Sequence, residues 1–307
     1  MDALITKYRP SSFEEVIGNA DVVAALRGMT SNKETCPHAF LFYGPTGCGK
    51  TTLARVVAHA LNCSKEDLYE YNSGSYRGID SIREISKSLS YMPMVGSIKV
   101  YILDEAHKLT NDAMNAILKD LEEPPSYVYF ILCTTDQEKL LPTIHNRCSK
   151  HRVAGLLSHQ VMQLLKRVCE AEGIDIPIEL VRKIGQVANG VPRECLTLLE
   201  SVRNLDPDQV NFVIEDFKKK EGTVRDICTL LLKKNQWGKI AEILKGLDED
   251  PERMRLGVLG YLSKVLLGTD PGSTADSLSS IILLFSEPTY SGGKSYLNAL
   301  FYEASKM

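Results

Sequence analysis

The stretch GPTGCGKT, residues 44–51, has the pattern G-x-x-x-x-G-K-[ST] of a loop that wraps around nucleotide phosphates. Its glycines let the backbone curve so closely that successive N–H groups point inward. Lys50 is placed to reach the outer phosphates, and the Thr51 hydroxyl is placed to bind Mg²⁺. The stretch predicts a site for a nucleotide and Mg²⁺, and it decides the fold because such a loop joins a strand to a helix.

The segments on either side of this loop support the prediction. Residues 38–43 form a short apolar run typical of a buried strand, and residues 52–61 have the pattern of a helix. The N-terminal end of that helix favours bound phosphate through its dipole. A glycine-rich turn can match the loop pattern by chance, but it needs neither flanking element. A strand–loop–helix unit is therefore the preferred interpretation.

The composition is that of an ordinary globular protein with more than one domain. The chain has 307 residues, of which 44% are hydrophobic and 24% charged, and this length suits two or three domains. A net charge of -3 argues against a protein that coats polyanions with its whole surface, so a nucleic-acid contact must be local. No signal-peptide core and no C-x-x-C pair are present. We expect an intracellular protein with reduced cysteines and no membrane partner.

Strands and helices alternate in the first half of the chain. Residues 68–71, 97–103 and 127–133 have strand patterns, with helical patterns between them. This alternation predicts an α/β fold with a mostly parallel sheet covered on both faces.

From about Leu156 onward the pattern is helical. A small helical unit extends to about Asn204, and the turn-rich and charged residues 206–222 predict a connecting region. Further helices are predicted at residues 223–234, 237–247, 252–267, 275–285 and 290–306.

Two adjacent carboxylates, Asp104 and Glu105, follow the predicted strand at 97–103. Parallel sheets bind ligands at the carboxyl ends of their strands. Asp104 would hold Mg²⁺, directly or through water, and Glu105 would orient and polarise the attacking water. The string DEAH, residues 104–107, also occurs in a class of helicases. Those helicases need a second motor domain, and the helical remainder of the chain offers no second nucleotide-type sheet.

Several strings together resemble the AAA+ clamp-loader ATPases, in particular the tau/gamma subunit of bacterial DNA polymerase III and the small subunits of replication factor C. The resemblance covers roughly Tyr8 to Asn204. It implies an AAA+ P-loop domain at residues 1–155, a helical lid at 156–205 and a helical collar at 206–307 that joins subunits into a five-membered ring. Besides the two ATP motifs, the strings are KYRP (7–10) with Phe13, VIG (16–18), LEEPP (121–125), TTD (134–136), NRC (146–148) and GVPR (190–193).

The resemblance also assigns roles to matched positions. Thr135 matches the first sensor of the terminal phosphate, and Arg193, at the start of a lid helix, matches the second. Arg147 matches an arginine that enters the ATP site of the neighbouring subunit, although Asn146 stands where the family has serine. An arginine supplied in trans accelerates related hydrolases by about 10³–10⁵-fold.

The predicted catalytic residues are Lys50, Glu105, Thr135, Arg193 and, in trans, Arg147. The predicted Mg²⁺ ligands are Thr51 and Asp104. The predicted ATP-binding residues are Tyr8, Arg9, Pro10, Val16, Ile17, Gly44, Pro45, Thr46, Gly47, Cys48, Gly49, Lys50, Thr51, Thr52, Pro192 and Arg193.

Residues 77–83, RGIDSIR, resemble a stretch of replication factor C that opens a helix facing the central DNA. The periodicity places Ile82, Ile85 and Leu89 on an apolar face and leaves Arg83 on another. We expect phosphate contacts that position a duplex without reading its sequence, although a solvated helix face would look the same. The predicted DNA-binding residues are Arg77, Arg83, Lys108, Thr110 and Asn111.

Downstream, Leu89, Tyr91, Met92 and Met94 are unusually apolar for a helix end. The resemblance suggests that they insert into a sliding clamp, and packing in the core is the alternative. Two features of the bacterial subunits are missing from this sequence: the zinc-binding cysteine insertion, and the long extension of the tau form beyond residue 307. We therefore expect no zinc site and no polymerase or helicase contacts through such an extension.

Together these features predict the ATPase motor subunit of a sliding-clamp loader, a DNA- and clamp-stimulated hydrolase that uses ATP and Mg²⁺ to load a processivity clamp onto primer-template DNA. Expected partners are other clamp-loader subunits, the clamp and the DNA. The expected location is the cytoplasm, or the host cytoplasm for a viral protein. A different AAA+ motor of branch migration or recombination, and a non-hydrolysing scaffold subunit that only donates Arg147, remain as alternatives.

Overall fold

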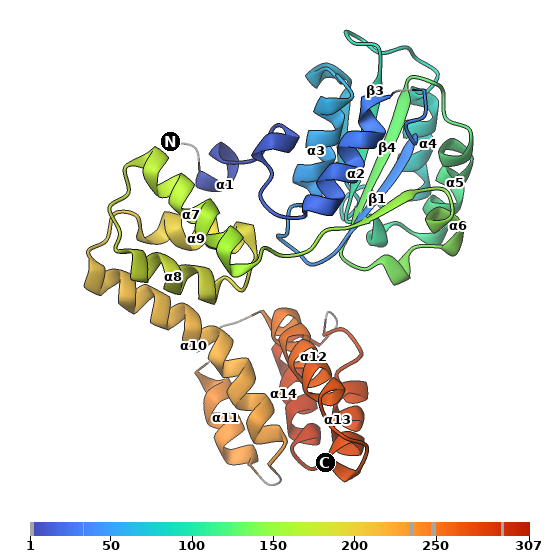
Figure 1. Cartoon of the computed structure of the whole chain (residues 1–307). Helices are drawn as coiled ribbons and strands as arrows, with labels where there is room; N and C mark the ends of the chain where they lie inside the picture. Colours follow the sequence, from blue (N-terminus) through green and yellow to red (C-terminus); the bar gives the residue numbers. More distant parts are fainter. Residues whose placement is uncertain (1–2, 33, 234–235, 247–249, 290–291) are drawn as a thin grey trace. The chain divides into compact units, whose positions relative to one another are not determined.

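The computed structural model describes residues 3–32, 34–233, 236–246, 250–289 and 292–307 (Figure 1). Contacts between residues divide the chain into two compact units, 1–211 and 212–307, here called unit one and unit two. The predicted division into three domains, with boundaries after 155 and 205, stays a prediction because the contacts divide the chain once, after residue 211.

A five-stranded parallel sheet forms the centre of unit one. The four predicted strands are confirmed, whereas β5 is missed by the sequence reasoning. Its sequence, Ser-Lys-His-Arg, contains no apolar run, and only His151 is buried there. The strands follow the order β2 (Leu68–Asn72), β3 (Lys99–Asp104), β4 (Val128–Thr134), β1 (Ala39–Tyr43) and β5 (Ser149–Arg152).

Helices cover both faces of this sheet (Figure 1). The central strands β1, β3 and β4 are apolar nearly throughout and buried, as expected for a parallel sheet between two helical layers. The predicted α/β architecture is confirmed. One face packs against α2 (Ala20–Ser31) and α3 (Lys50–Ala60), and the other against α4 (Ile79–Ser88), α5 (Asn111–Glu122) and α6 (Pro142–His145).

A three-helix bundle completes unit one. Gly173, with φ of 64°, ends its first helix, and Pro192 stands at the first position of its third, where a missing N–H does no harm. The bundle consists of α7 (Ser158–Glu172), α8 (Ile178–Val187) and α9 (Pro192–Val202), and the short α1 (Leu4–Lys7) packs against α9. Short 3₁₀ turns lie at Phe13–Glu15, Lys65–Asp67, Ala106–Lys108 and Gln137–Lys139.

The predicted connecting region at 206–222 is wrong, because α10 runs without a break from Pro207 to Leu231. The Asp206 carboxylate accepts the N–H of Gln209 at 3.0 Å and so caps the helix, and proline is favourable just inside a helix start. Lysine and glutamate are good helix formers, so a charged run does not by itself end a helix.

Unit two contains the other predicted C-terminal helices. They are α11 (Trp237–Lys245), α12 (Pro251–Leu267), α13 (Ser273–Leu284) and α14 (Gly293–Ala304). Their shared core includes Val258, Leu262 and Phe301. The predicted helix ends at Lys234, Leu247 and Tyr290 lie outside the described residues. Within the part of the chain that is described, none of the helices combines the length and apolarity needed to span a membrane. All eight cysteines are free, and most are buried.

Candidate functional site

The predicted phosphate-binding loop, residues 44–51, connects the end of β1 to the start of α3. Two of its glycines are required by close contacts. A Cβ atom on Gly44 would lie 2.1 Å from the Val153 carbonyl oxygen, and one on Gly47 would lie 2.6 Å from a Val191 methyl carbon. Both also have positive φ, which side chains rarely adopt. The loop can therefore curve tightly against its surroundings only with glycine at these positions.

Lys50 is buried in this loop, with 6% of its surface exposed. Its ammonium group donates hydrogen bonds to the carbonyl oxygens of Gly44 and Pro45, both at 2.9 Å. Within the described residues, no carboxylate oxygen lies in ion-pair contact with it. Burial lowers the pKa of Lys50, although the charge of Glu105 opposes this shift. A buried cation without a contacting anion is well suited to bind a phosphate.

The Thr51 hydroxyl donates a hydrogen bond to Asp104 Oδ2 at 2.9 Å, which joins the start of α3 to the end of β3. Asp104 Oδ1 in turn accepts the Glu105 N–H at 3.0 Å. Hydroxyl and carboxylate oxygens are ligands that Mg²⁺ prefers, and Mg²⁺ at nucleotide sites needs only one or two protein ligands besides phosphates. The pair therefore fits Mg²⁺, although the described residues contain no cluster of three or more acidic, His or Cys side chains that could hold a metal.

Glu105 adopts the left-handed conformation, with φ of 53°. A non-glycine residue held there stores strain on the order of 1–3 kcal/mol, a feature that concentrates at functional sites. Its carboxylate lies 3.4 Å from His107 Nε2 and 4.0 Å from the Lys108 ammonium. The other ring nitrogen of His107 contacts the Thr134 hydroxyl at 3.1 Å, and burial lowers the pKa of this histidine. Glu105 is therefore linked both to the end of β4 and to Lys108.

A cavity of about 400 Å³ opens in front of the loop, a size typical of small-ligand sites. It is lined by the N-terminal segment, the loop, the acidic pair and the helical bundle, so the structure brings these parts of the sequence to one cavity. Gly44 and Pro45 reach Lys50 through their carbonyl groups but do not line the cavity, and neither do Thr135 and Arg147. The predicted residues that line it are Tyr8, Arg9, Pro10, Val16, Ile17, Thr46, Gly47, Cys48, Gly49, Lys50, Thr51, Thr52, Asp104, Glu105, Pro192 and Arg193.

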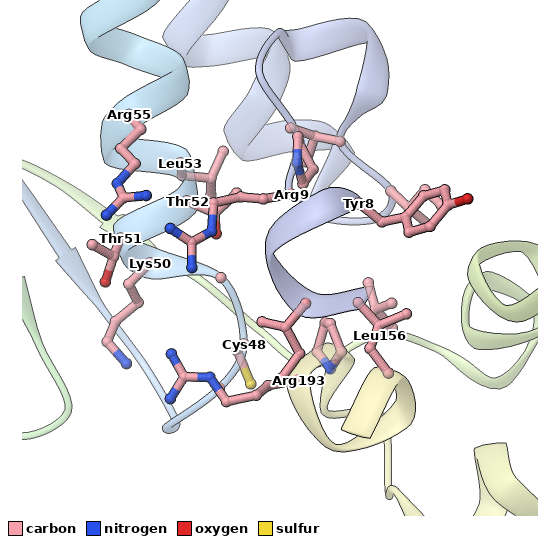
Figure 2. A pocket seen from close by; sticks show the side chains of 18 of the residues that line it. Tyr8, Arg9, Cys48, Lys50, Thr51, Thr52, Leu53, Arg55, Leu156 and Arg193 are labelled. Atoms are coloured by element: carbon pink, nitrogen blue, oxygen red, sulfur yellow. The ribbon is translucent and has the colours of Figure 1, made fainter. Parts of the chain in front are cut away.

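The sequence reasoning missed Arg55 and Glu70, which also line this cavity. Their side chains form a two-point ion pair, with both hydrogen bonds at 2.9 Å. Figure 2 shows Arg9, which follows α1, Arg55 of α3 and Arg193 of α9 extending toward the loop around Lys50. Burial, and next the charge of Arg55, lower the pKa of Arg9. Helical spacing could have revealed Arg55, because it lies four residues after Thr51 and so on the same face of α3.

Tyr8 lies at the rim of the cavity, with its ring directed away from Lys50 (Figure 2). Its hydroxyl donates to Glu172 of α7 at 2.5 Å, and Lys7 forms an ion pair with the same carboxylate at 2.6 Å. Burial, together with the hydrogen bond to Glu172, raises the pKa of Tyr8 to about 12. The N-terminal segment is thus fastened to the helical bundle, a contact that no sequence pattern indicated.

Arg147 follows α6, and its side chain is hydrogen-bonded within the same chain. Its guanidinium donates to Glu122 Oε2 at 2.9 Å and to the Thr143 carbonyl oxygen at 3.0 Å. Its Nε is buried and has no hydrogen-bond partner among the residues that the structure describes. Thr135 follows the end of β4 and is half-buried, and its predecessor Thr134 makes the contact to His107. The predicted roles of Arg147 and Thr135 stay predictions.

Four of the five predicted DNA-binding residues lie at or just before the starts of α4 and α5, and Arg83 lies within α4. The Thr110 N–H donates to the Arg77 carbonyl oxygen at 3.0 Å, which holds the two helix starts together, and the Thr110 hydroxyl caps α5. Arg83 is exposed on α4 and pairs with Asp80 at 3.2 Å. The apolar face predicted for α4 is confirmed, because Ile82, Ile85 and Leu89 are buried. All five predicted residues, Arg77, Arg83, Lys108, Thr110 and Asn111, are exposed.

The segment that follows α4 divides at Leu89. Leu89 is in the core, but Tyr91, Met92 and Met94 are exposed by 70%, 69% and 75%. Val95, which the sequence reasoning missed, is exposed by 69%. The alternative that these residues pack in the core is therefore correct for Leu89 and wrong for Tyr91, Met92 and Met94.

Comparisons with known proteins agree with this architecture. A family model described as "DNA polymerase III, delta subunit" matches residues 67–156. The gamma/tau subunit of DNA polymerase III from Mycobacterium tuberculosis is 35% identical over 223 residues, covering 65% of this chain and 38% of the relative. The tau subunit of Bacillus subtilis is 31% identical over 299 residues, covering 88% and 53%. The gamma subunit of Buchnera aphidicola from Schizaphis graminum is 35% identical over 230 residues, covering 68% and 63%. The chain thus spans less than two thirds of each of these relatives.

Among solved structures, the RuvB Holliday junction branch migration motor of Thermotoga maritima is similar, with a TM-score of 0.60 and 19% identity over 89% of this chain and 88% of that chain. At this identity the likeness shows the fold alone. The chain has an AAA+ fold with a helical C-terminal part, and the resemblance to AAA+ clamp-loader subunits is confirmed.

Proposed function

We infer that this chain, which has the AAA+ fold and resembles the clamp-loader subunits of DNA polymerase III, is an ATPase subunit of a sliding-clamp loader. It binds ATP with Mg²⁺, holds or opens a ring-shaped clamp, and hydrolyses ATP after primer-template DNA binds. The observation that carries the proposal is the cavity of unit one, where the phosphate-binding loop, the Thr51–Asp104 pair and Arg193 face one space.

The cavity supports a triphosphate as the bound group. Lys50 and Arg193, with Arg9 beside them, offer cationic donors, and the backbone amides of the loop add neutral ones. Thr51 and Asp104 would hold Mg²⁺, which neutralises charge on the phosphate oxygens when bound. Glu105 lies at the same cavity and is the group that would orient the attacking water.

The geometry also suggests how DNA stimulates hydrolysis. Lys108 is a predicted DNA-binding residue, and its ammonium lies 4.0 Å from the carboxylate of Glu105. A phosphate bound at the start of α5 would compete for Lys108 and so free the Glu105 carboxylate from this contact. The exposed side chains of Arg77 and Arg83 would bind phosphates of the same DNA strand without reading its base sequence.

Arg147 is the residue proposed to act on a neighbouring subunit. It does not line this chain's own cavity, and its pairing with the half-exposed Glu122 is of a kind worth only about 0–1 kcal/mol. The guanidinium could therefore exchange Glu122 for the phosphates of an adjacent subunit in a ring. The exposed apolar side chains of residues 91–95 support a contact with the clamp, because large apolar side chains on a surface mark interaction sites.

A steady-state ATPase assay of the full chain, with its partner subunits, primer-template DNA and the clamp of the same replication system, tests the proposal. We expect hydrolysis that rises when DNA and clamp are added together. Glu105→Gln should retain ATP binding and lose turnover, and normal turnover in that variant would remove Glu105 from its role.

The alternatives predict different results. A branch-migration motor would be stimulated by four-way junction DNA without a clamp, and a scaffold subunit would bind ATP without hydrolysing it. The intact set of Lys50, Thr51, Asp104 and Glu105 argues against the scaffold. The cytoplasmic location belongs to the same proposal.

A further inference from the structure

The exposed apolar segment between α4 and β3, residues 91–95, is here called the apolar loop. The residues that flank it on either side, Leu89 and Ile98, are buried in the core of unit one. On the α4 side, the Tyr127 hydroxyl donates to the Leu89 carbonyl oxygen at 2.8 Å, and the Lys99 ammonium donates to the Ser88 carbonyl oxygen at 3.2 Å. The side chains of Tyr91, Met92, Met94 and Val95 nevertheless point into solvent.

The C-terminal end of the apolar loop is held by one side chain from an earlier part of the sequence. Asp67, immediately before β2, is completely buried, and its Oδ1 accepts the Met94 N–H at 2.5 Å. Its Oδ2 accepts the N–H groups of Val95 at 3.0 Å and of Gly96 at 2.8 Å. The Ser64 hydroxyl donates to Oδ2 as well, at 2.7 Å.

This arrangement stabilises a buried negative charge without a cation. Within the described residues, Asp67 has no lysine, arginine or histidine at ion-pair distance. Burial opposes ionisation, but the hydrogen bonds from Gly96, Ser64, Met94 and Val95 outweigh it and lower the pKa of Asp67 to about 2. The carboxylate is therefore charged at any working pH, and three successive amides bind it with charge-assisted hydrogen bonds.

We propose that Asp67 is a positioning residue that fixes the apolar loop in the shape that contacts the sliding clamp, an inference that rests on the proposed clamp-loader function. Asp67 accepts hydrogen bonds from the backbone N–H groups of Met94 and Val95, whose side chains are exposed and do not pack in the core. These bonds therefore fix the shape of a surface segment. A loop that is ordered before it binds loses less conformational freedom on association, and this strengthens binding.

The test compares variants in the reconstituted loader with primer-template DNA and purified clamp. Asp67→Asn keeps the size of the side chain, removes the charge and turns an amide donor toward backbone donors. We expect the clamp concentration for half-maximal ATPase stimulation to rise by about tenfold or more, equivalent to roughly 1.4 kcal/mol. The maximal rate at saturating clamp and the rate without clamp should stay close to those of the unchanged chain. The unfolding temperature should fall, because buried donors lose their charged acceptor, so the rates are measured well below it.

Three further variants sharpen the comparison. Glu66→Gln removes an acidic charge from the exposed neighbouring position and should change nothing. Ser64→Ala removes one of the four bonds and should give a smaller rise than Asp67→Asn. Met94→Ala removes one of the exposed apolar side chains and should weaken the clamp response directly.

Hydrogen exchange on the unchanged chain gives a second measurement that does not depend on any variant folding. The amides of Met94, Val95 and Gly96 should be protected before the clamp is added, and their protection should change little afterwards. Protection that develops only with clamp would overturn the inference, because the clamp would then order the loop.

The failures of the two proposals are distinguishable. If Met94→Ala weakens the clamp response and Asp67→Asn does not, the role of Asp67 is wrong and the clamp-loader function stands. If the clamp has no effect on the unchanged assembly, the proposed function itself is wrong.

Discussion

Both units of the molecule bury cations, and two of these, Lys50 in unit one and Arg255 in unit two, are surrounded differently. Lys50 in unit one, exposed by 6%, donates to two carbonyl oxygens of its own loop. Arg255 in unit two, exposed by 4%, forms a two-point ion pair with Glu252, with hydrogen bonds at 2.5 and 3.0 Å. Arg255 also donates to the carbonyl oxygens of Phe285, at 2.6 Å, and Ser286, at 3.3 Å.

The difference separates a functional charge from a structural one. A buried charge needs a compensating partner, and in unit two that partner belongs to the protein. The Glu252 carboxylate also accepts hydrogen bonds from the N–H and the hydroxyl of Thr289, at 2.8 and 2.9 Å. The charges of Arg255 and Glu252 are therefore both compensated within the protein, and this set is called the closed network. In unit one the compensation for Lys50 is partial, which leaves room for a ligand to complete it. Removing the cation should therefore abolish binding in unit one and lower stability in unit two.

The largest expected effect extends the comparison to Arg147, a cation whose ion-pair partner, Glu122, is exposed. Arg147→Ala should bind ATP normally and lower the hydrolysis rate of the assembled ring by about 10³–10⁵-fold, because the arginine acts on the neighbouring phosphates. The measurement is ATPase activity of rings that mix Arg147→Ala with Lys50→Ala subunits. Full DNA-independent activity of the isolated chain as a monomer would contradict the trans mechanism.

The next effect tests the closed network. Glu252→Gln should lower the free energy of unfolding of unit two by about 3–5 kcal/mol, because it leaves Arg255 buried without its anion. Chemical denaturation followed through Trp237, which lies in unit two, measures this change. Glu303→Gln, which breaks the exposed pair with Lys306 at 2.8 Å, is the matched control and should change the free energy by less than about 1 kcal/mol. Equal effects of the two variants would refute the comparison.

Lys50→Ala should lower ATP affinity by about 100-fold or more, since it removes a charge-assisted donor from the phosphate site. Titration of a fluorescent ATP analogue measures the affinity. The unfolding of unit two should be unchanged, and a large loss of stability in unit one would mean that Lys50 is a structural residue like Arg255.

Acid should affect unit two through Glu252. The hydrogen bond from Arg255, with further bonds from Thr289, lowers the pKa of Glu252 from 4.5 to about 2. A carboxylate whose pKa is lower in the folded state contributes stability that is complete above its unfolded pKa. We therefore expect this contribution to be present above about pH 4.5 and lost as the pH falls toward 2. Denaturation at several pH values should show a smaller decline in the Glu252→Gln variant.

The smallest effect concerns the pair of Glu122 and Arg147. Glu122→Gln should change stability by less than about 1 kcal/mol, because the glutamate is half-exposed. A few-fold change in the hydrolysis rate of the ring is expected, since Arg147 would be freer to leave its position. A severe loss of rate would show that Glu122 orients Arg147 for its task.

Local patterns predicted the parts of the site that lie close together in the sequence. The phosphate-binding loop and the Asp104–Glu105 pair each follow an apolar strand, and both strands are in the sheet at the predicted positions. The prediction failed where a local pattern was ambiguous. The polar strand β5 pairs with β1 only because the sheet edge is available, and the charged start of α10 is as compatible with a helix as with a linker.

The sequence by itself determined the α/β order, the phosphate-binding loop, the acidic pair and the apolar face of α4, because each depends on spacing within a few residues. Only the tertiary structure decided which distant groups meet. It joined Arg55 to Glu70, Tyr8 to Glu172 and Asp67 to the apolar loop. It also showed that Lys50 contacts neutral carbonyl oxygens, whereas Arg255 contacts a carboxylate. The physical reason is that hydrogen bonds and ion pairs depend on distances across the fold, which no local periodicity contains.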